Sequence, residues 1–175
     1  MGRVMIGEQT RIEPRRKVVP GDAEAIVELH ERLYVAEYGM GQAFVDGVRD
    51  SVAAAIERGW PAGGGAWLVD SDDGLAGCLG LTDESDGLGK LRWVLLHPDL
   101  RGSGLGRRMI AGAVAEGRHL GFERLELDTF GALRSAAAIY RSQGFRCVSE
   151  ERTEKWGPPI VFQHYVLELA SDKAA

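Results

Sequence analysis

The sequence predicts a mixed α/β (α+β) fold with an antiparallel hairpin in its first half and a parallel crossover in its second. Apolar runs at residues 66–69 and 75–81 flank the polar, glycine-ended turn 70–74, which is the pattern of two antiparallel strands. Strand and helix patterns then alternate, at residues 90–96, 105–120, 125–129 and 132–143. A strand–helix–strand connection of this kind makes its two strands parallel.

Two helices are expected before the hairpin. From Asp22, the expected N-cap, apolar residues recur at helical spacing as far as Tyr38 and Gly39. A second helical pattern runs from Gln42 to Ile56, and the turn-rich stretch 59–65 ends it. Val18 and Val19, ahead of the first helix, predict a short strand.

Two strands close the chain, around residues 145–149 and 160–169, with a Trp-Gly-Pro-Pro turn between them. A length of 175 residues suits one domain. We expect that domain to span residues 16–170, with residues 1–15 as a loose lead-in and residues 171–175 as a tail.

Composition excludes several classes of protein. With 45% hydrophobic and 27% charged residues the chain is an ordinary folded domain, and its net charge of −5 argues against nucleic acid or membrane partners. Cys78 and Cys147 lie far apart without metal-ligand spacing, so no metal site or disulfide framework is expected. No apolar run approaches the ~20 residues of a membrane span. We therefore expect a cytoplasmic protein.

The segment richest in chemistry joins the strand 90–96 to the helix 105–120. After His97 and Pro98 it reads Arg101-Gly102-Ser103-Gly104-Leu105-Gly106-Arg107. Glycines let the main chain approach a phosphate closely, and the unpaired amides of a first helical turn favour negative charge. Arg101 and Arg107 can add charge-assisted hydrogen bonds. The pattern predicts a site for a phosphate-bearing ligand.

Other readings of this segment remain. A P-loop would need Lys and then Ser or Thr after its last glycine, where this chain has Arg107. A dinucleotide turn needs GxGxxG directly at the strand end, although Asp128 at the next strand end keeps that reading open. The glycines could also serve only tight packing of the helix start.

These residues resemble the acetyl-CoA motif of the GNAT superfamily, a strand and a Pro followed by Gln or Arg and xxGxG. The run Ala136-Ala137-Ala138-Ile139-Tyr140 and the later Gly144-Phe145 are similar to its second signature. The resemblance covers residues 18–169. It implies a mostly antiparallel sheet of six or seven strands with a splayed parallel pair at the centre, flanked by four helices.

The two-helix start, with Tyr34 to Gly39, most resembles the acetyltransferase domain found fused to MarR-type regulators. No helix-turn-helix segment is present in this sequence. One departure from the superfamily is Leu133, where many members place an Asn that helps to hold the cofactor.

The resemblance implies direct acetyl transfer from acetyl-CoA to an amine. The expected cofactor-binding residues are Val94, Leu95, Leu96, Arg101, Gly102, Ser103, Gly104, Leu105, Gly106, Arg107, Thr129 and Tyr140. The main-chain amide of Leu95 is the candidate donor to the reaction's oxyanion. Tyr140 is the candidate acid that protonates the leaving thiolate, and a tyrosine that only packs under the sheet is the alternative.

The acceptor side is less determined by the sequence. Glu37 is the first candidate for the base, with an ordinary solvated carboxylate as the alternative, and Glu84 and Asp86 are weaker candidates. Tyr34 and Glu37 are expected in the substrate wall. Arg92 could bind a substrate carboxylate, or it could pair with Glu126 or Asp128.

The sequence predicts no catalytic role for the four histidines. His97, just before Pro98, is expected to cap the strand, and His30, His119 and His164 show no partner spacing.

The favoured function is N-acetylation of a small-molecule amine, such as an amino acid or another amine with a carboxylate. Two alternatives are a non-catalytic module that binds or senses acyl-CoA, and a dinucleotide-dependent oxidoreductase. The sequence does not decide whether the protein forms a homodimer.

Overall fold

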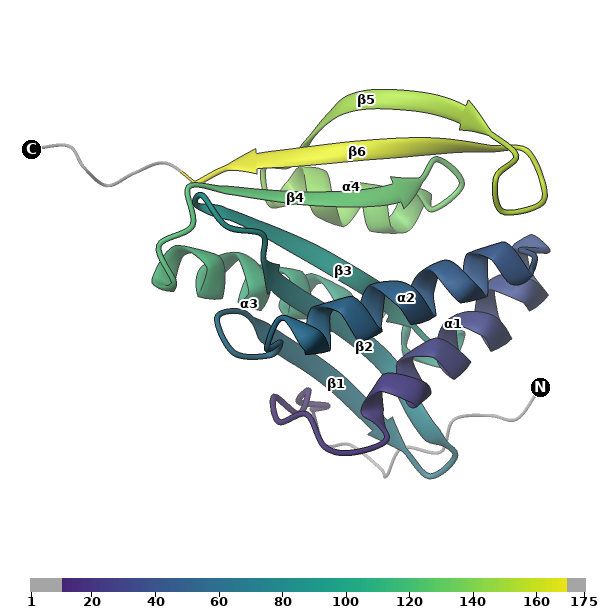
Figure 1. Cartoon of the computed structure of the whole chain (residues 1–175), viewed down its shortest axis with the longest axis horizontal. Helices are drawn as coiled ribbons and strands as arrows, with labels where there is room; N and C mark the ends of the chain where they lie inside the picture. Colours follow the sequence, from purple (N-terminus) through teal and green to yellow (C-terminus); the bar gives the residue numbers. More distant parts are fainter. Residues whose placement is uncertain (1–10, 170–175) are drawn as a thin grey trace, which may run out of the picture.

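The computed structural model describes residues 11–169, in which four α-helices flank a six-stranded sheet (Figure 1). The helices are α1 (Asp22–Tyr38), α2 (Gln42–Glu57), α3 (Leu105–His119) and α4 (Arg134–Ser142). The strands are β1 (Gly65–Ser71), β2 (Gly74–Asp83), β3 (Leu88–Leu96), β4 (Arg124–Phe130), β5 (Arg146–Thr153) and β6 (Ile160–Glu168). A short 3₁₀ turn, η1 (Pro98–Leu100), leads into α3.

The strand order is β1-β2-β3-β4-β6-β5, and the β3–β4 pair is parallel while the other neighbours are antiparallel. This confirms the predicted hairpin, the predicted crossover and the fold class. Figure 1 shows α1 and α2 over one face of β1 to β3, with α3 on the opposite face.

The parallel pair is short. Leu88 to Lys90 of β3 pair with Arg124 to Glu126 of β4, and the two strands part beyond that point. Farther along β3 the register with β2 shifts between Cys78 and Gly80, which leaves an extra residue on the β3 side. The sheet is therefore continuous at one end of its central strands and open at the other.

Trp93 lies in this bulge with a φ of 53°, a left-handed conformation that costs a bulky residue roughly 1–2 kcal/mol. Its indole packs edge-on against Trp60 and donates to Ser51 Oγ at 3.1 Å. Gly80 is required opposite, because a Cβ there would lie 2.5 Å from the Trp93 ring. Local contacts thus hold the bulge in place.

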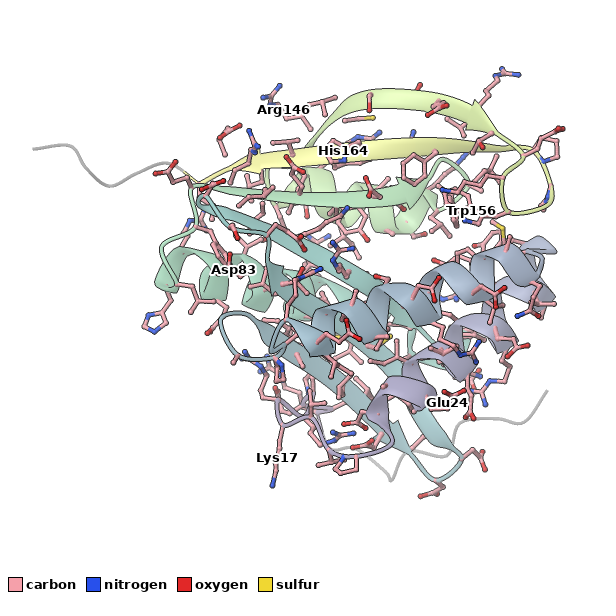
Figure 2. The ribbon with its side chains drawn as sticks, viewed as in Figure 1. Lys17, Glu24, Asp83, Arg146, Trp156 and His164 are labelled. Atoms are coloured by element: carbon pink, nitrogen blue, oxygen red, sulfur yellow. The ribbon has the colours of Figure 1, made fainter. Side chains whose placement is uncertain are left out.

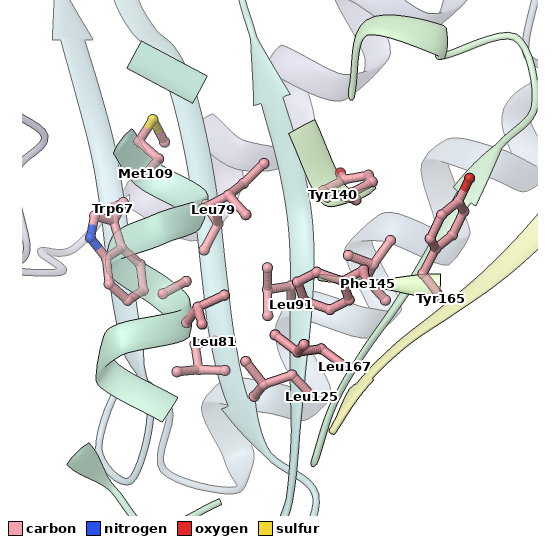
Figure 3. Close-up of a cluster of buried hydrophobic side chains, with 14 of the residues drawn as sticks. Trp67, Leu79, Leu81, Leu91, Met109, Leu125, Tyr140, Phe145, Tyr165 and Leu167 are labelled. Atoms are coloured by element: carbon pink, nitrogen blue, oxygen red, sulfur yellow. The ribbon is translucent and has the colours of Figure 1, made fainter. Parts of the chain in front are cut away.

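Each face of the sheet buries its own apolar cluster. On the α3 and α4 side the cluster contains Leu79, Leu81 and Leu125 of the sheet and Met109 of α3 (Figure 3), together with Leu127 and Ile110. On the α1 and α2 side the cluster contains Ile26, Leu29, Leu33, Val45, Leu68 and Cys78. Removing one such Leu side chain typically costs 2–5 kcal/mol of stability. The two clusters hold the helices on which the site residues lie.

The start of the described chain differs from expectation. Val18 and Val19 form no strand; instead Arg15 makes two main-chain hydrogen bonds with Leu68 of β1, at 2.7 and 2.8 Å. Gly21 occupies the N-cap position predicted for Asp22. The buried Asp22 carboxylate accepts the Val19 amide and pairs with Arg15.

The remaining lead-in, residues 1–10, and the tail from residue 170 lie outside the described residues. Among residues 11–169, no helix combines the length and apolarity that crossing a bilayer requires.

Candidate active site

The loop between β3 and α3 is shaped by its glycines. Gly102 and Gly104 have φ angles of 74° and 83°, and a Cβ at either position would meet nothing within 4 Å. Backbone conformation, not packing, therefore requires glycine at both. Before the loop, His97 Nδ1 accepts the Asp99 amide at 3.2 Å, so His97 caps the 3₁₀ turn η1 and not the strand that the sequence predicted it to cap.

Unpaired amides gather where α3 begins. Leu105, the first helical residue, reaches only Ser103 Oγ, at 3.4 Å. Among the hydrogen bonds of residues 11–169, none is donated by the amides of Gly102, Ser103, Gly104, Gly106 or Arg107. The first turn of α3 carries no acidic side chain. Five free donors at the positive end of a helix form a site that suits a phosphate or diphosphate.

The two arginines of the loop are already engaged. Arg101 forms a bidentate pair with Glu37 at the end of α1, with both N–O distances 2.9 Å, and its Nε donates to the Leu96 carbonyl. The hydrogen bonds to Glu37 raise the pKa of Arg101 above its usual value. Arg107 donates to Ser142 Oγ at 3.1 Å. The sequence prediction did not foresee the contact between Glu37 and Arg101.

A pocket of about 390 Å³ crosses the sheet where β3 and β4 part. Its walls come from α1, α2, β3, β4, α4 and the β5–β6 loop. Predicted site residues that line it are Tyr34, Arg92, Val94, Thr129 and Tyr140; Glu37 does not. Trp156, in the β5–β6 loop (Figure 2), is one of the residues that line the pocket. Its main-chain carbonyl accepts the Gly41 amide at 2.8 Å.

The register of β3 determines which of its amides face the pocket. The His97 amide donates to the Ala76 carbonyl at 2.7 Å, and Leu95 lies opposite Cys78 on the same ladder. Because hydrogen-bonded pairs alternate along antiparallel strands, the Leu95 amide is directed toward β2. The amides of Val94 and Leu96 are directed to the open edge. The register therefore favours Val94 over Leu95 as an oxyanion donor.

Tyr140 lies between the α4-side core and the pocket. Only 3% of it is exposed, and its ring packs against Phe145 and Tyr165 (Figure 3). Its hydroxyl has no hydrogen-bond partner among the described residues, and neither does the hydroxyl of Tyr34 across the pocket. Burial raises the pKa of both phenols, and for Tyr34 the nearby Tyr140 adds to the rise. Both hydroxyls are therefore protonated donors at neutral pH.

Charged side chains at the pocket are mostly paired. Lys90 contacts Asp128 at 2.8 Å, and Asp128 also bonds His164 at 2.7 Å. Burial works against the charged form of Asp128, but these hydrogen bonds outweigh it and hold its pKa below the usual value.

Arg92 pairs with Glu84 at 2.8 Å and also donates to Thr82, not to the Glu126 or Asp128 considered from sequence. The Glu84 carboxylate is thereby engaged. Lys155 differs from both of these cations, since its ammonium lies 5.0 Å from the Trp156 ring and contacts no carboxylate of the described chain.

His30 is a pocket residue to which the sequence assigned no role. It is 4% exposed, stacks on Tyr34, and shares its Nδ1 with the Ile26 carbonyl at 2.8 Å. Burial lowers the pKa of His30 to about 4, so the ring is neutral at pH 7. Its spacing four residues before Tyr34 places both on one helical face, a signal that could have singled it out.

Comparison with known proteins identifies the family. The model of the acetyltransferase (GNAT) family matches residues 24–145, which include the amide-rich loop, Tyr140 and the parted strands. The chain belongs to the GNAT acetyltransferase family. This removes the dinucleotide-dependent oxidoreductase alternative. The link to domains fused to MarR-type regulators stays a prediction.

Similar GNAT proteins support the assignment. The N-acetyltransferase YjgM of Escherichia coli K12, itself uncharacterised, is 28% identical over 117 residues, 63% of this chain and 68% of that one. A GNAT-family structure from Desulfovibrio desulfuricans is 26% identical with a TM-score of 0.66, over 91% of this chain and all of that one. A Salmonella typhimurium structure with its cofactor acetyl-CoA has the same fold, at 18% identity and a TM-score of 0.65, covering 95% and 98% of the two chains.

The loop glycines make a first test of this GNAT site. Gly104→Ala, at a φ of 83°, is expected to shift the amides and weaken acetyl-CoA binding ~10-fold, because the left-handed conformation costs roughly 1–2 kcal/mol with a side chain. Gly121→Ala is the matched control, since Gly121 has a φ of 81° and equally open surroundings but lies beyond the far end of α3. Calorimetric titration would measure both. Equal affinities in the two variants would contradict the assignment.

His30 predicts a pH dependence of stability. Its pKa is about 4 when folded and about 6.5 when unfolded, so between those values the unfolded chain binds the extra proton. The free energy of unfolding should thus fall by about 3 kcal/mol as the pH is lowered from 7 to 4, at 1.36 kcal/mol per pKa unit. Urea melts at several pH values should show a smaller decline for His30→Phe, whereas the exposed control His119→Phe keeps the wild-type decline. An unchanged decline in His30→Phe would count against a buried neutral ring.

Proposed function

We propose that this GNAT protein transfers the acetyl group of acetyl-CoA to the primary amine of a small molecule. The observation that carries the proposal is the row of free amides at the start of α3, placed beside a pocket that crosses the parted sheet. The related Salmonella structure contains acetyl-CoA, which supports this choice of cofactor.

The loop fits the diphosphate of that cofactor. Main-chain donors at Gly102, Ser103, Gly104, Gly106 and Arg107 match its oxygens, and Leu105 opens the helix behind them. Arg107, whose partner is the neutral Ser142 hydroxyl, adds positive charge, whereas Glu37 balances the charge of Arg101. The amides of Val94 and Leu96, on the edge of β3 that β4 leaves open, suit the amide-bearing arm that leads to the thioester. Thr129, buried across the opening on β4, faces the same space.

The reaction proposed is direct attack. The neutral amine nitrogen bonds to the thioester carbonyl carbon, whose oxygen takes the negative charge, and the carbon–sulfur bond then breaks to release a thiolate. The Val94 amide is positioned to donate to that oxygen, and a single such donor is typically worth ~3 kcal/mol. The protonated Tyr140 hydroxyl gives its proton to the thiolate. The amine nitrogen loses its proton to solvent, and solvent returns a proton to the Tyr140 phenolate.

On the side of the pocket where the amine acceptor would bind, the contacts of Glu37 and Arg92 change the roles that the sequence suggested for them. Both oxygens of Glu37 are bound by Arg101, so we propose that Glu37 positions Arg101 and that the amine enters the pocket already neutral. Arg92 lines the pocket but is paired with Glu84, so we propose that it does not bind a substrate carboxylate. Tyr34 keeps its predicted place in the acceptor wall.

Ligand-induced stabilisation tests the cofactor. Acetyl-CoA at ~100 times its Kd should stabilise the fold by roughly 2.7 kcal/mol, while NAD(P) at the same concentration should not. A thermal melt with each ligand, followed by a thiol-release assay over an amine panel, measures both steps. Binding of acetyl-CoA without transfer to any amine would favour the non-catalytic module instead.

Tyr140→Phe tests the acid. It should lower kcat about 100-fold while sparing the Kd for acetyl-CoA, because a positioned acid is worth 10²- to 10⁴-fold. Tyr165→Phe is the matched control, since Tyr165 is buried beside Tyr140 but does not line the pocket. Steady-state kinetics would show the contrast. Unchanged turnover in Tyr140→Phe would end its catalytic role.

A further inference from the structure

His30 presents an unpaired acceptor to the pocket. Its Nδ1 is used by the Ile26 carbonyl of its own helix, so Nε2, on the other side of the ring, points away from α1. No donor among residues 11–169 reaches Nε2, although the side chain is 4% exposed. Among residues 11–169, the fully buried side-chain nitrogen that lacks a partner is Arg108 Nε and not His30 Nε2, so Nε2 keeps some access to the pocket. It can therefore accept a hydrogen bond from a bound ligand.

The surroundings of His30 suit an aromatic guest. Tyr34 stacks on the imidazole, and Phe44 follows at 4.7 Å from the Tyr34 ring. Phe130 and Trp156 continue the wall, 5.7 Å apart between ring centroids. An aromatic ring prefers contacts of this kind, and a volume of about 390 Å³ suits a small molecule better than a peptide.

His30 lies one helical turn along α1 from the end of the pocket where Tyr140 is proposed to act. Tyr34 lies across the pocket from Tyr140, and His30 precedes Tyr34 by one helical turn. A donor that reaches His30 Nε2 therefore belongs to the body of the acceptor and not to its reacting amine.

Lys155 supplies a complementary charge. Three cations line the pocket, and of these Lys90 and Arg92 are paired with Asp128 and Glu84. Lys155 meets no carboxylate in the described chain and lies over Trp156. This balance disfavours polycationic acceptors such as polyamines and favours one that carries an anionic group.

We propose that the acceptor is an aromatic amino acid or close analogue, whose side-chain hydroxyl or N–H donates to His30 Nε2 and whose carboxylate binds Lys155. The proposal rests on amine acetylation as the function of the site. A side-chain donor is favoured over a bare ring, because a bound analogue without it would cover His30 Nε2 and leave this acceptor unpaired.

Four amines separate the two contacts: free tyrosine, free phenylalanine, tyramine and phenethylamine. The wild type should acetylate tyrosine at least ~10-fold better than phenylalanine by kcat/KM, and better than tyramine by a similar factor. His30→Phe should bring the ratio of tyrosine to phenylalanine near one and leave the ratio of tyrosine to tyramine unchanged. Lys155→Met should bring the ratio of tyrosine to tyramine near one and leave the ratio of tyrosine to phenylalanine unchanged. His119→Phe and Lys17→Met, both at exposed positions, are the matched controls.

Further measurements keep the outcomes distinct. His30→Gln, which retains an acceptor, should keep part of the tyrosine preference, and it replaces His30→Phe if that variant does not fold. Transfer with no tyrosine preference, or with a preference that survives His30→Phe, would overturn the His30 contact while amine acetylation stands. If none of the four amines is acetylated, their binding measured by calorimetry decides: tyrosine bound no tighter than phenylalanine would refute the subsite as well.

Discussion

The separation of β3 from β4 is the constraint on which the rest of the site depends. Only Leu88 to Lys90 pair with β4, and beyond them the main chain of β3 has no neighbour on one side. Unpaired strand amides are costly unless something binds them. A strand-like ligand along this edge would satisfy them, and the pocket through the opening gives a second molecule access from the α1 and α2 side.

Two local features adapt β3 and its loop to this task. The bulge at Trp93, made possible by Gly80, alters the phase of the strand so that Val94 and Leu96 face the opening. Gly102 and Gly104 then turn the chain into α3 with its first amides free. The open strand edge and the helix start thus supply two sets of free donors, which fit a ligand with amide and diphosphate groups.

Much of the fold could be predicted because it follows from local pattern. Helical periodicity placed α1 to α4 nearly to the residue, and the alternation of strand and helix predicted the parallel pair. The loop 101–107 could also be interpreted locally, since glycines and a helix start determine its chemistry.

What the sequence could not predict depends on contacts between distant residues. Glu37 and Arg101 are 64 positions apart, and Arg92 pairs with Glu84, in the loop after β2, instead of a partner on β4. The direction in which each β3 amide points depends on a bulge that residue propensities do not reveal. The sequence therefore predicted Leu95 as the oxyanion donor, whereas the register favours Val94. No spacing in the sequence marked His30 as a site residue, because its neighbours in the pocket are the packed rings of Tyr34 and Phe44 and not a charged or polar partner.

The most direct test of the central claim is an amide chemical-shift titration of the ¹⁵N-labelled protein with acetyl-CoA. The largest changes are expected on the amides of residues 102–107 at the start of α3, with smaller ones at Val94 and Leu96. Saturable binding that leaves those amides unperturbed, with the changes elsewhere in the chain, would contradict the claim.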